Sequence, residues 1–337
     1  MTIFDSTVTS EQVVAAFASQ VNGRTFVITG AGHPSIGSSI ATELAKASPA
    51  QILIASRTAS NANPVLAAVR EIDPSIRTTF VQVDLSDHVA VRRGAQQILA
   101  ATDSKIDVLI NSAGNMALKD YTLDKQGIEL QFSVNHVGHF LLTNLLTPAL
   151  LAAAAANPDL GARVVNLTSA GYQISPVRYA DPAFSDGAAY DPWSGYGQAK
   201  TAQILFAYGL TQRLGSRGVL ALACHPGSNL DTKLGAHLVM EDYADVAPVT
   251  KRNTGNEFGF TVGDEPRFKT YEQIGATPLI AALDPELAVA KAPGAACYLQ
   301  NGQSMQPVAE HAYGVEHVDK CWKLSEKLVG QGFEYED

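Results

Sequence analysis

Short apolar runs alternate with segments of helical periodicity along most of the chain. The apolar runs predict strands at Thr25–Thr29, Gln51–Ser56, Thr78–Val83, Val108–Asn111, Arg163–Thr168, Val219–Ala223 and Ala295–Leu299. The segments between them predict helices at Ile36–Ala47, Pro64–Ile72, Val89–Ala101, Ile128–Ala156 and Gly197–Leu214. Because the strands are nearly continuous apolar runs, the sheet should be covered on both faces. We therefore expect an α/β fold of the Rossmann type, with a doubly wound parallel sheet of about seven strands and helices on both faces.

The two ends of the chain and one late segment depart from this alternation. A short helix is predicted over residues 10–21, with Ser10 as its N-cap, and an amphipathic helix over residues 317–330. Residues 227–276 are rich in Gly, Asp, Thr and Asn and contain no clear strand. A long irregular segment of this kind is typical of a lid, so we interpret it as a substrate-lid insertion. Neither an internal repeat nor a linker is visible, which favours a single domain over residues 1–337.

The composition narrows the classes of partner. The 337 residues are 46% hydrophobic and 17% charged, with a formal net charge of −9. Nucleic acid and anionic membranes require a basic face, so we expect neither as a partner. The most apolar stretch, residues 141–156, is interrupted by polar side chains and is expected to be a buried helix, not a transmembrane anchor. Three cysteines and a polar N-terminus without a basic start favour a cytoplasmic location.

The first strand runs into a glycine-rich turn with the sequence TGAGHPSIG at residues 29–37, and a helix follows. Glycines let a backbone turn tightly and approach a pyrophosphate, whose charge the N-terminus of the next helix stabilises. Pro34 lacks an amide hydrogen, so we expect the phosphate contacts to shift to Ser35 or Ile36. The alternative is a strand–helix turn that binds no ligand.

The end of the second strand predicts which nicotinamide cofactor is bound. An acidic side chain there would bind the ribose hydroxyls of NAD(H), whereas a cation would bind the 2′-phosphate of NADP(H). The chain has Ser56, Arg57 and Thr58 at this point and no acid. The guanidinium of Arg57 offers a fork of donors to a phosphate, so we predict NADP(H). His33 in the glycine turn either assists this binding or is a solvated loop residue.

Tyr196 and Lys200 lie four residues apart in a predicted helix, which places them on one helical face. A free phenol has a pKa near ~10 and is a sluggish base at neutral pH. A nearby ammonium stabilises the phenolate, and each unit of pKa lowering corresponds to ~1.4 kcal/mol. Ser169, which follows the fifth strand, adds a hydroxyl that can bind an oxygen where charge develops. This set predicts acid–base chemistry on a carbonyl or an alcohol.

At this point the sequence resembles the short-chain dehydrogenase/reductase family, from about Thr25 to Gly227. The motifs that carry the resemblance are the glycine turn, Asp84-Leu85, Asn111-Ser112-Ala113-Gly114, Asn135 in the string NHVGHF, Ser169, Tyr196 with Lys200, and Pro226-Gly227. The NHVGHF string, the Ser-Arg pair after the second strand and His225-Pro226-Gly227 resemble the retinol-dehydrogenase-like branch and its fungal secondary-metabolism relatives.

The resemblance implies a role for each motif. Tyr196 is expected to be the general acid in carbonyl reduction, Lys200 to hold the ribose, Ser169 to bind the substrate oxygen, and Asn135 to hold a water that links Lys200 to solvent. The implied catalytic residues are Asn135, Ser169, Tyr196 and Lys200. The expected cofactor-binding residues are Gly30, His33, Ser35, Ile36, Gly37, Ser56, Arg57, Thr58, Asp84, Leu85, Asn111, Ala113, Gly114, Tyr196, Lys200, Pro226, Gly227 and Thr232. Either Asp231 or Thr232 can fill the Thr position after Pro226-Gly227, and we favour Thr232.

The predicted substrate is a small apolar carbonyl or alcohol. Residues 174–194 form an insert with four aromatic side chains that we interpret as part of the substrate rim: Tyr179, Phe184, Tyr190 and Trp193. Further rim candidates are Phe258, Phe260 and Tyr271. His136 and His139 lie three residues apart without an acidic or cysteine partner, so packing is favoured over a metal site and no metal is expected.

Three functions remain open at this stage. The first is an NADPH-dependent reductase of ketones or aldehydes, or the reverse alcohol dehydrogenase. The second is an epimerase or dehydratase that holds a nicotinamide on the same fold, and the third is a non-catalytic dinucleotide-binding protein. The long apolar helix is compatible with pairing in a homo-oligomer, and equally with being covered by the C-terminal part of the chain.

Overall fold

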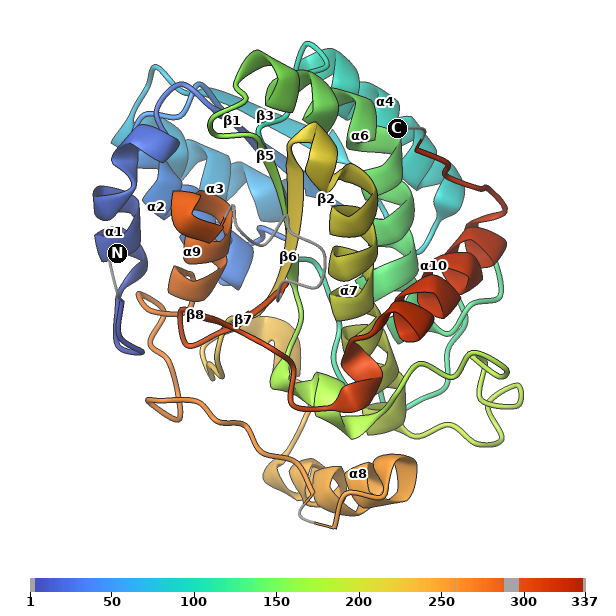
Figure 1. The fold of residues 1–337 in the computed structure, drawn as a ribbon. Helices are drawn as coiled ribbons and strands as arrows, with labels where there is room; N and C mark the ends of the chain where they lie inside the picture. Colours follow the sequence, from blue (N-terminus) through green and yellow to red (C-terminus); the bar gives the residue numbers. More distant parts are fainter. Residues whose placement is uncertain (1–3, 258, 288–296, 336–337) are drawn as a thin grey trace.

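A mostly parallel sheet forms the centre of the protein (Figure 1). The computed structural model describes residues 4–257, 259–287 and 297–335. Its strands are β1 (Thr25–Thr29), β2 (Gln51–Ser56), β3 (Arg77–Gln82), β4 (Val108–Asn111), β5 (Ala162–Leu167), β6 (Val219–His225), β7 (Tyr298–Gln300) and β8 (Gln303–Met305). They follow the order β3-β2-β1-β4-β5-β6-β7-β8, and every neighbouring pair from β3 to β7 is parallel. The predicted fold class is thereby confirmed.

Helices cover both faces of this sheet (Figure 1). One layer holds α1 (Ser10–Ala16), α2 (Ile36–Ala45), α3 (Ala59–Ile72) and α9 (Ala276–Leu283). The other layer holds α4 (His88–Ala101), α6 (Gly138–Ala156) and α7 (Pro192–Leu214), with α10 (Val315–Val329) packed on the outside of α7. The short helix α5 (Leu130–Phe132) precedes α6, and α8 (Val246–Thr254) lies beyond the sheet, near the start of α7.

The strand predictions differ from the structure mainly at the far edge of the sheet. β3 and β5 begin one residue earlier than expected, and β6 continues to His225. The last predicted strand, Ala295–Leu299, falls partly outside the described residues, and β7 is observed at Tyr298–Gln300. The antiparallel strand β8 was not predicted, because it has only three residues, of which Gln303 and Ser304 are polar, and so leaves no apolar run.

Two helices, α3 and α7, begin five residues earlier than their sequence pattern indicates. α3 starts at Ala59 and contains Pro64, which was expected to be its first residue. α7 starts at Pro192, five residues before the predicted Gly197, because the Asp191 side chain caps it by accepting from the amide of Ser194 at 2.8 Å. Tyr196 therefore lies in the second turn of α7. α8 and α9 were not predicted.

The predicted helix Ile128–Ala156 is divided by a π-helical turn at Ser133–Val137. Such turns shift backbone carbonyls out of the regular hydrogen-bond pattern. Residues 130–156 are long and apolar enough to cross a membrane by composition, but 78% of that apolar window is buried within the fold. The segment is therefore a core helix of this protein, as the sequence predicted.

Helix α10 covers the outer side of α6 and α7. Trp322 packs its ring centroid 5.0 Å from that of Phe140 and 5.9 Å from that of Phe206. The guanidinium carbon of Arg213 lies 3.9 Å from the Trp322 ring centroid, within cation–π range. Of the two alternatives for the long apolar helix, the structure shows cover by the C-terminal part of the same chain.

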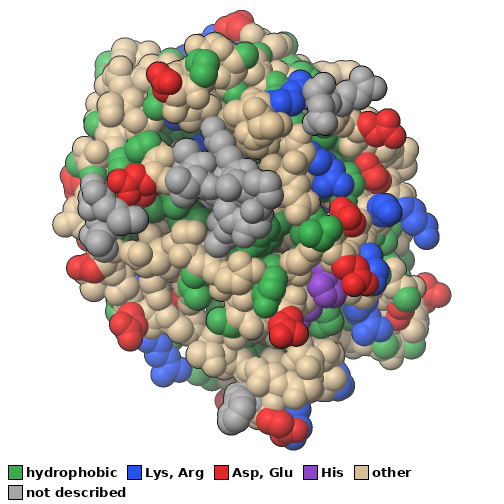
Figure 2. Space-filling view, in the orientation of Figure 1, with side chains coloured by type: hydrophobic (Ala, Val, Ile, Leu, Met, Phe, Trp, Pro, Cys, Tyr) green, Lys and Arg blue, Asp and Glu red, His purple; other side chains and the backbone are tan. Residues whose placement is uncertain are grey.

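The surface carries both signs of charge. On the face shown in Figure 2, acidic and basic side chains are interspersed, and apolar side chains lie singly or in small groups between them. This face is therefore not a basic surface of the kind that tracks a phosphate backbone.

Replacing Trp322 with alanine tests the packing of α10. The indole is 4% exposed, so we expect Trp322→Ala to lower the free energy of unfolding by ~3–5 kcal/mol, measured by chemical denaturation. Val315→Ala, at a side chain on the same helix that is 66% exposed, is the matched control and should change stability by less than ~0.5 kcal/mol. Equal losses in the two variants would contradict this packing.

Candidate active site

A cavity of about 440 Å³ opens at the carboxyl ends of the central strands. The strand order reverses between β1 and β4, and parallel α/β sheets bind ligands in the crevice at such a point. The predicted cofactor residues that line the cavity are Gly30, Ser35, Ile36, Ser56, Arg57, Asp84, Leu85, Ala113, Gly114 and Thr232. The structure thus brings together side chains from five separate motifs.

Gly30 is held against the turn that follows β4. Its φ angle is +69°, and a Cβ added there would lie 2.5 Å from the Cα of Ala113. Only glycine allows this conformation together with this approach. The glycine turn and the Asn111–Gly114 motif therefore lie directly against each other in the lining of the cavity.

The N-terminus of α2 faces the same cavity. Ser35 caps the helix: its hydroxyl accepts from the amide of Ser38 at 3.1 Å and donates to the carbonyl of Gly30 at 3.0 Å. A helix N-terminus carries partial positive charge and favours an anion. Tyr271 was interpreted as a substrate-rim residue, but its hydroxyl lies 2.6 Å from Ser38 Oγ and 3.1 Å from the Ser35 carbonyl oxygen. That interpretation was wrong, because the lid folds back against the glycine turn.

The ends of β2 and β3 supply the polar wall of the cavity. Ser56 and the exposed Arg57 follow β2, and Asp84 and Leu85 follow β3. The Asp84 carboxylate accepts from the backbone amide of Ser86 at 3.0 Å and from its hydroxyl at 2.7 Å, which orders this loop. The exposed guanidinium of Arg57 therefore lies at the end of β2, next to this ordered loop.

Several predicted cofactor residues lie outside the cavity lining. Asn111 is fully buried and donates to Thr143 Oγ1 at 3.0 Å and to Asn166 Oδ1 at 2.8 Å, so its side chain joins three elements of the core. The others are His33 and Thr58, which are exposed, Gly37, which packs on Ala31, Pro226 and Gly227, which follow β6, and the buried Tyr196 and Lys200.

Tyr196 and Ser169 meet beneath the lid. Tyr196 is 4% exposed, and Ser169 caps a short 3₁₀ turn by accepting from the amide of Gly171 at 3.1 Å. A Cβ at Gly171 would lie 2.6 Å from Cε1 of Tyr196, so the turn packs directly on the phenol ring. Burial raises the pKa of Tyr196 to about 12, and a hydrogen bond with the Ser169 hydroxyl opposes that rise.

Lys200 lies one helical turn after Tyr196, with Nζ 5.5 Å from the tyrosine ring centroid. Its ammonium donates to the carbonyl of Leu167 at 3.0 Å and to Gln203 Oε1 at 2.9 Å. Burial lowers the pKa of Lys200 to about 7. The sequence predicted that Lys200 would lower the pKa of Tyr196, but in the chain alone desolvation of both groups is the larger effect.

Asn135 lies in the π-helical turn and points its amide at the loop after β4. Its Oδ1 accepts from the amide of Asn115 at 2.8 Å, and its Nδ2 donates to the carbonyl of Asn115 at 3.0 Å. A Cβ at Gly114 would lie 2.9 Å from Asn135 Oδ1 and 3.8 Å from Lys200 Nζ. Asn135 and Lys200 therefore both lie next to Gly114. All four predicted catalytic residues come together at this end of the sheet.

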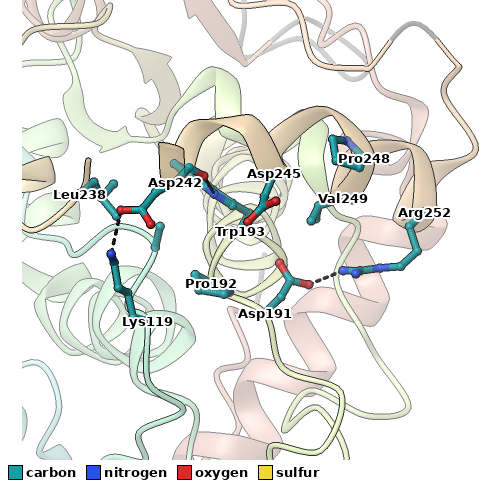
Figure 3. Close-up of a pocket in the computed structure, with 11 residues that line it drawn as sticks. Lys119, Asp191, Pro192, Trp193, Leu238, Asp242, Asp245, Pro248, Val249 and Arg252 are labelled. Atoms are coloured by element: carbon teal, nitrogen blue, oxygen red, sulfur yellow. Dashed lines mark hydrogen bonds and ion pairs between the residues drawn. The ribbon is translucent and has the colours of Figure 1, made fainter. Parts of the chain in front are cut away.

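A second cavity, of about 460 Å³, lies between the lid and the start of α7 (Figure 3). Its apolar lining includes Trp193, Leu238 and Val249. The same three side chains belong to an apolar cluster with Tyr196 and Val246. The lid thus packs onto the phenol from the side of this cavity.

Two ion pairs join the lid to the rest of the site (Figure 3). Lys119 Nζ lies 2.9 Å from the carboxylate of Asp242, and Arg252 on α8 pairs with Asp191, the N-cap of α7. The indole of Trp193 also donates to the backbone carbonyl of Asp242 at 2.8 Å. These contacts fix the lid over the first turns of the helix that carries Tyr196 and Lys200.

The aromatic insert contributes less to this cavity than the sequence indicated. Trp193 lines it, and Phe260 packs against the apolar cluster. Phe184 is fully buried, Tyr179 stacks on His317 beside α10, and Tyr190 donates to the carbonyl of Leu118 at 2.7 Å. These three rings are structural, so their interpretation as a rim was wrong. Phe258 lies outside the described residues.

Several polar residues at the site were not predicted as site residues from the sequence. Thr29, Asn115 and Lys233 line the cofactor cavity, and His139 contacts Thr29 at 2.8 Å. Thr29 opens the glycine turn and Asn115 directly follows the Asn111–Gly114 motif, so both could have been found from their positions. Lys233 follows Thr232 directly, but a lysine in an irregular segment has no signal of its own. Thr232, the favoured candidate for the Thr position, lines the cavity, and Asp231 is not among its lining residues.

Comparison with known proteins agrees with this geometry. Residues 24–180 match the family model for short chain dehydrogenases. The chain is 33% identical to the short-chain dehydrogenase/reductase prx1 of Penicillium roqueforti, covering 78% of this chain and 73% of that protein. It is 37% identical to retinol dehydrogenase 12 of Mus musculus over 62% of each chain.

Solved structures show the same fold. A crystal structure of an uncharacterized protein from Mycobacterium paratuberculosis is 28% identical, with a TM-score of 0.64, over 93% of this chain and 96% of that chain. The family match and the sequence relatives indicate one family, and the solved structures share its fold. The chain belongs to the short-chain dehydrogenase/reductase family, oxidoreductases that use a nicotinamide dinucleotide to interconvert carbonyl and alcohol groups of small molecules.

Proposed function

We propose that this protein is an NADPH-dependent reductase of ketones or aldehydes that also catalyses the reverse alcohol oxidation. The observation that carries the proposal is the pairing of Tyr196 and Ser169 under the lid, one helical turn from Lys200 and beside the cavity at the β1–β4 crevice. A proton donor, an oxygen-binding hydroxyl and an ammonium are the groups that carbonyl reduction requires.

In the proposed mechanism, Tyr196 is the general acid that donates the proton. In reduction, the Tyr196 hydroxyl gives its proton to the carbonyl oxygen as that oxygen gains negative charge, and the Ser169 hydroxyl donates a hydrogen bond to the same oxygen. The nicotinamide, when bound, supplies the hydride that reaches the carbonyl carbon. Lys200, as the ammonium, stabilises the phenolate left on Tyr196 and holds the ribose hydroxyls. In oxidation the same groups act in reverse.

The cofactor cavity fits a dinucleotide with a 2′-phosphate. Gly30 gives the close approach that a pyrophosphate needs, and the capped N-terminus of α2 offers partial positive charge. At the end of β2 the wall presents Arg57 and no acidic side chain, which favours NADP(H) over NAD(H).

We infer that residues 227–276 are the substrate lid and that the substrate is apolar. The lid buries Tyr196 with Trp193, Val246 and Val249, so a substrate must displace part of this apolar cluster to reach the phenol. An apolar carbonyl compound would restore the contacts that it displaces.

The three buried thiols suit a reducing cytoplasm, and we propose that the chain acts there as one domain.

Removing the phenolic hydroxyl tests the proposed acid. Tyr196→Phe should reduce carbonyl turnover by ~10²–10⁴-fold, because the proton donor is lost, while NADPH affinity stays near the wild-type value. Turnover is measured as NADPH oxidation on a panel of apolar ketones and aldehydes.

Tyr208→Phe is the control for that substitution, because Tyr208 is a largely buried tyrosine on the same helix with its hydroxyl near Gln306. It should retain wild-type turnover. Full activity of Tyr196→Phe on every accepted substrate would refute the mechanism, and turnover without net NADPH oxidation would indicate an epimerase or a dehydratase.

Neutralising Arg57 tests the cofactor preference. Arg57→Gln should raise the Kd for NADPH by about tenfold or more and leave the Kd for NADH nearly unchanged, because only NADPH carries the 2′-phosphate. Arg70→Gln removes an exposed arginine of α3 that does not line the cavity, and should leave both constants unchanged. A wild-type preference for NADH would contradict this assignment.

The lowered pKa of Lys200 predicts a pH dependence of cofactor binding. Because that pKa is about 7 in the chain alone, Lys200 is protonated below pH 7 and becomes neutral above it. The ammonium is the stronger donor to the ribose hydroxyls, so the Kd for NADPH should rise as the pH increases above about 7. Lys200→Met should bind more weakly and without this dependence, whereas Lys105→Met, at an exposed lysine, should keep it. A wild-type Kd that stays constant from pH 6 to pH 9 would contradict the role.

A further inference from the structure

His139 is buried in α6, four residues after Asn135, and its ring touches two separate parts of the site. The imidazole is 1% exposed. Its Nδ1 lies 3.0 Å from the backbone carbonyl oxygen of Asn135, and its Nε2 lies 2.8 Å from the hydroxyl of Thr29. The ring therefore bridges the π-helical turn and the end of β1.

The hydrogen-bond partners determine where the protons lie. A carbonyl oxygen only accepts, so Nδ1 of His139 carries the hydrogen and donates it to Asn135. The Thr29 hydroxyl oxygen already accepts from the amides of Ser112 and Ala113, at 3.0 and 3.1 Å. With both lone pairs used, Thr29 donates its own hydrogen to Nε2 of His139. Burial lowers the pKa of His139 to about 4, which agrees with a neutral ring.

This chain of hydrogen bonds joins three walls of the site. Thr29 ends β1 and lines the cofactor cavity, and Ser112 with Ala113 begins the loop after β4, which lines the same cavity. At the other end, the π-helical turn carries Asn135, whose side chain holds Asn115 in that loop. The neutral imidazole thus fixes the walls of the cofactor cavity relative to the turn that carries Asn135.

His136 gives a built-in comparison. It is also 1% exposed, and burial lowers its pKa to about 3. The Ser325 hydroxyl donates to the carbonyl of Cys321 at 2.8 Å, so it accepts from Nε2 of His136 at 2.7 Å. This bond connects α10 to the π-helical turn, on the side away from the cofactor cavity. Two buried neutral histidines, three residues apart, thus have different partners.

We propose that His139 is a positioning residue for this oxidoreductase, whose Nδ1–H holds the turn of Asn135 and whose Nε2 holds the Thr29 hydroxyl that orders the cofactor wall. The proposal rests on the proposed function, because it takes the cavity lined by Thr29 to be the cofactor site. His139 touches neither reacting group, so it acts through Asn135 and through Thr29.

Two substitutions separate the two bonds of the ring. In His139→Asn, the side-chain amide can still donate to the carbonyl four residues earlier, as Asn144 in α6 does to Phe140 at 2.7 Å, but it no longer reaches Thr29. In His139→Gln, the longer side chain can accept from Thr29 but leaves the Asn135 carbonyl without its donor.

We expect the two variants to change different constants. His139→Asn should raise the Kd for NADPH about tenfold, measured by the fluorescence of NADPH, with kcat near the wild-type value. His139→Gln should lower kcat about tenfold with a nearly unchanged Kd. Thr29→Val removes the same hydroxyl from the other side and should raise the Kd as His139→Asn does.

His136→Gln is the matched control. It should lower the melting temperature as the His139 variants do, with unchanged Kd and kcat, because its partner Ser325 belongs to α10. If all three histidine variants change Kd and kcat alike, or if Thr29→Val binds NADPH normally, the proposal is wrong. The binding measurement needs no turnover. Failure of the proposed function would instead appear as unimpaired Tyr196→Phe or as no carbonyl reduction by the wild type.

Discussion

The close approach of the β1 and β4 turns is the contact on which the rest of the site depends. Gly30 and Ala113 approach so closely that no side chain fits at position 30, and the Thr29 hydroxyl binds the amides of Ser112 and Ala113 across the same gap. This contact forms at the reversal of strand order, where helices diverge to opposite faces and leave a crevice. The loop after β4, which this contact holds, lines the cavity and is bound by Asn135 from the π-helical turn.

Burial accounts for the electrostatics of the catalytic pair. Tyr196 and Lys200 are both nearly inaccessible to water, so burial favours the neutral form of each, raising the pKa of Tyr196 to about 12 and lowering that of Lys200 to about 7. A cofactor and a substrate would change that balance by replacing the lid contacts and adding new hydrogen-bond partners. Val246 and Val249, from residues 227–276, pack with Tyr196 in one apolar cluster, so this segment contributes to the desolvation of the phenol.

Much of the fold and the cofactor wall could be predicted from the sequence. Apolar runs located the main strands, because a strand buried on both faces leaves a clear local signal. Glycines in the turn after β1 and the Tyr196–Lys200 spacing are likewise local, since they follow from backbone sterics and from the pitch of a helix. The aromatic insert was harder to interpret, because the identity of Tyr179 or Phe184 does not tell whether the ring faces a substrate or packs on other residues of the chain.

What the sequence by itself determined is the order of elements and the identity of the chemical groups, because both depend on residues close together in the chain. Only the tertiary structure decided which partners those groups find. It placed Tyr271 on the glycine turn, Arg252 on the N-cap of α7 and His139 on Thr29, across separations that no local pattern records. Such pairings follow from packing of the whole sheet, helices and lid, and so only the assembled fold reveals them.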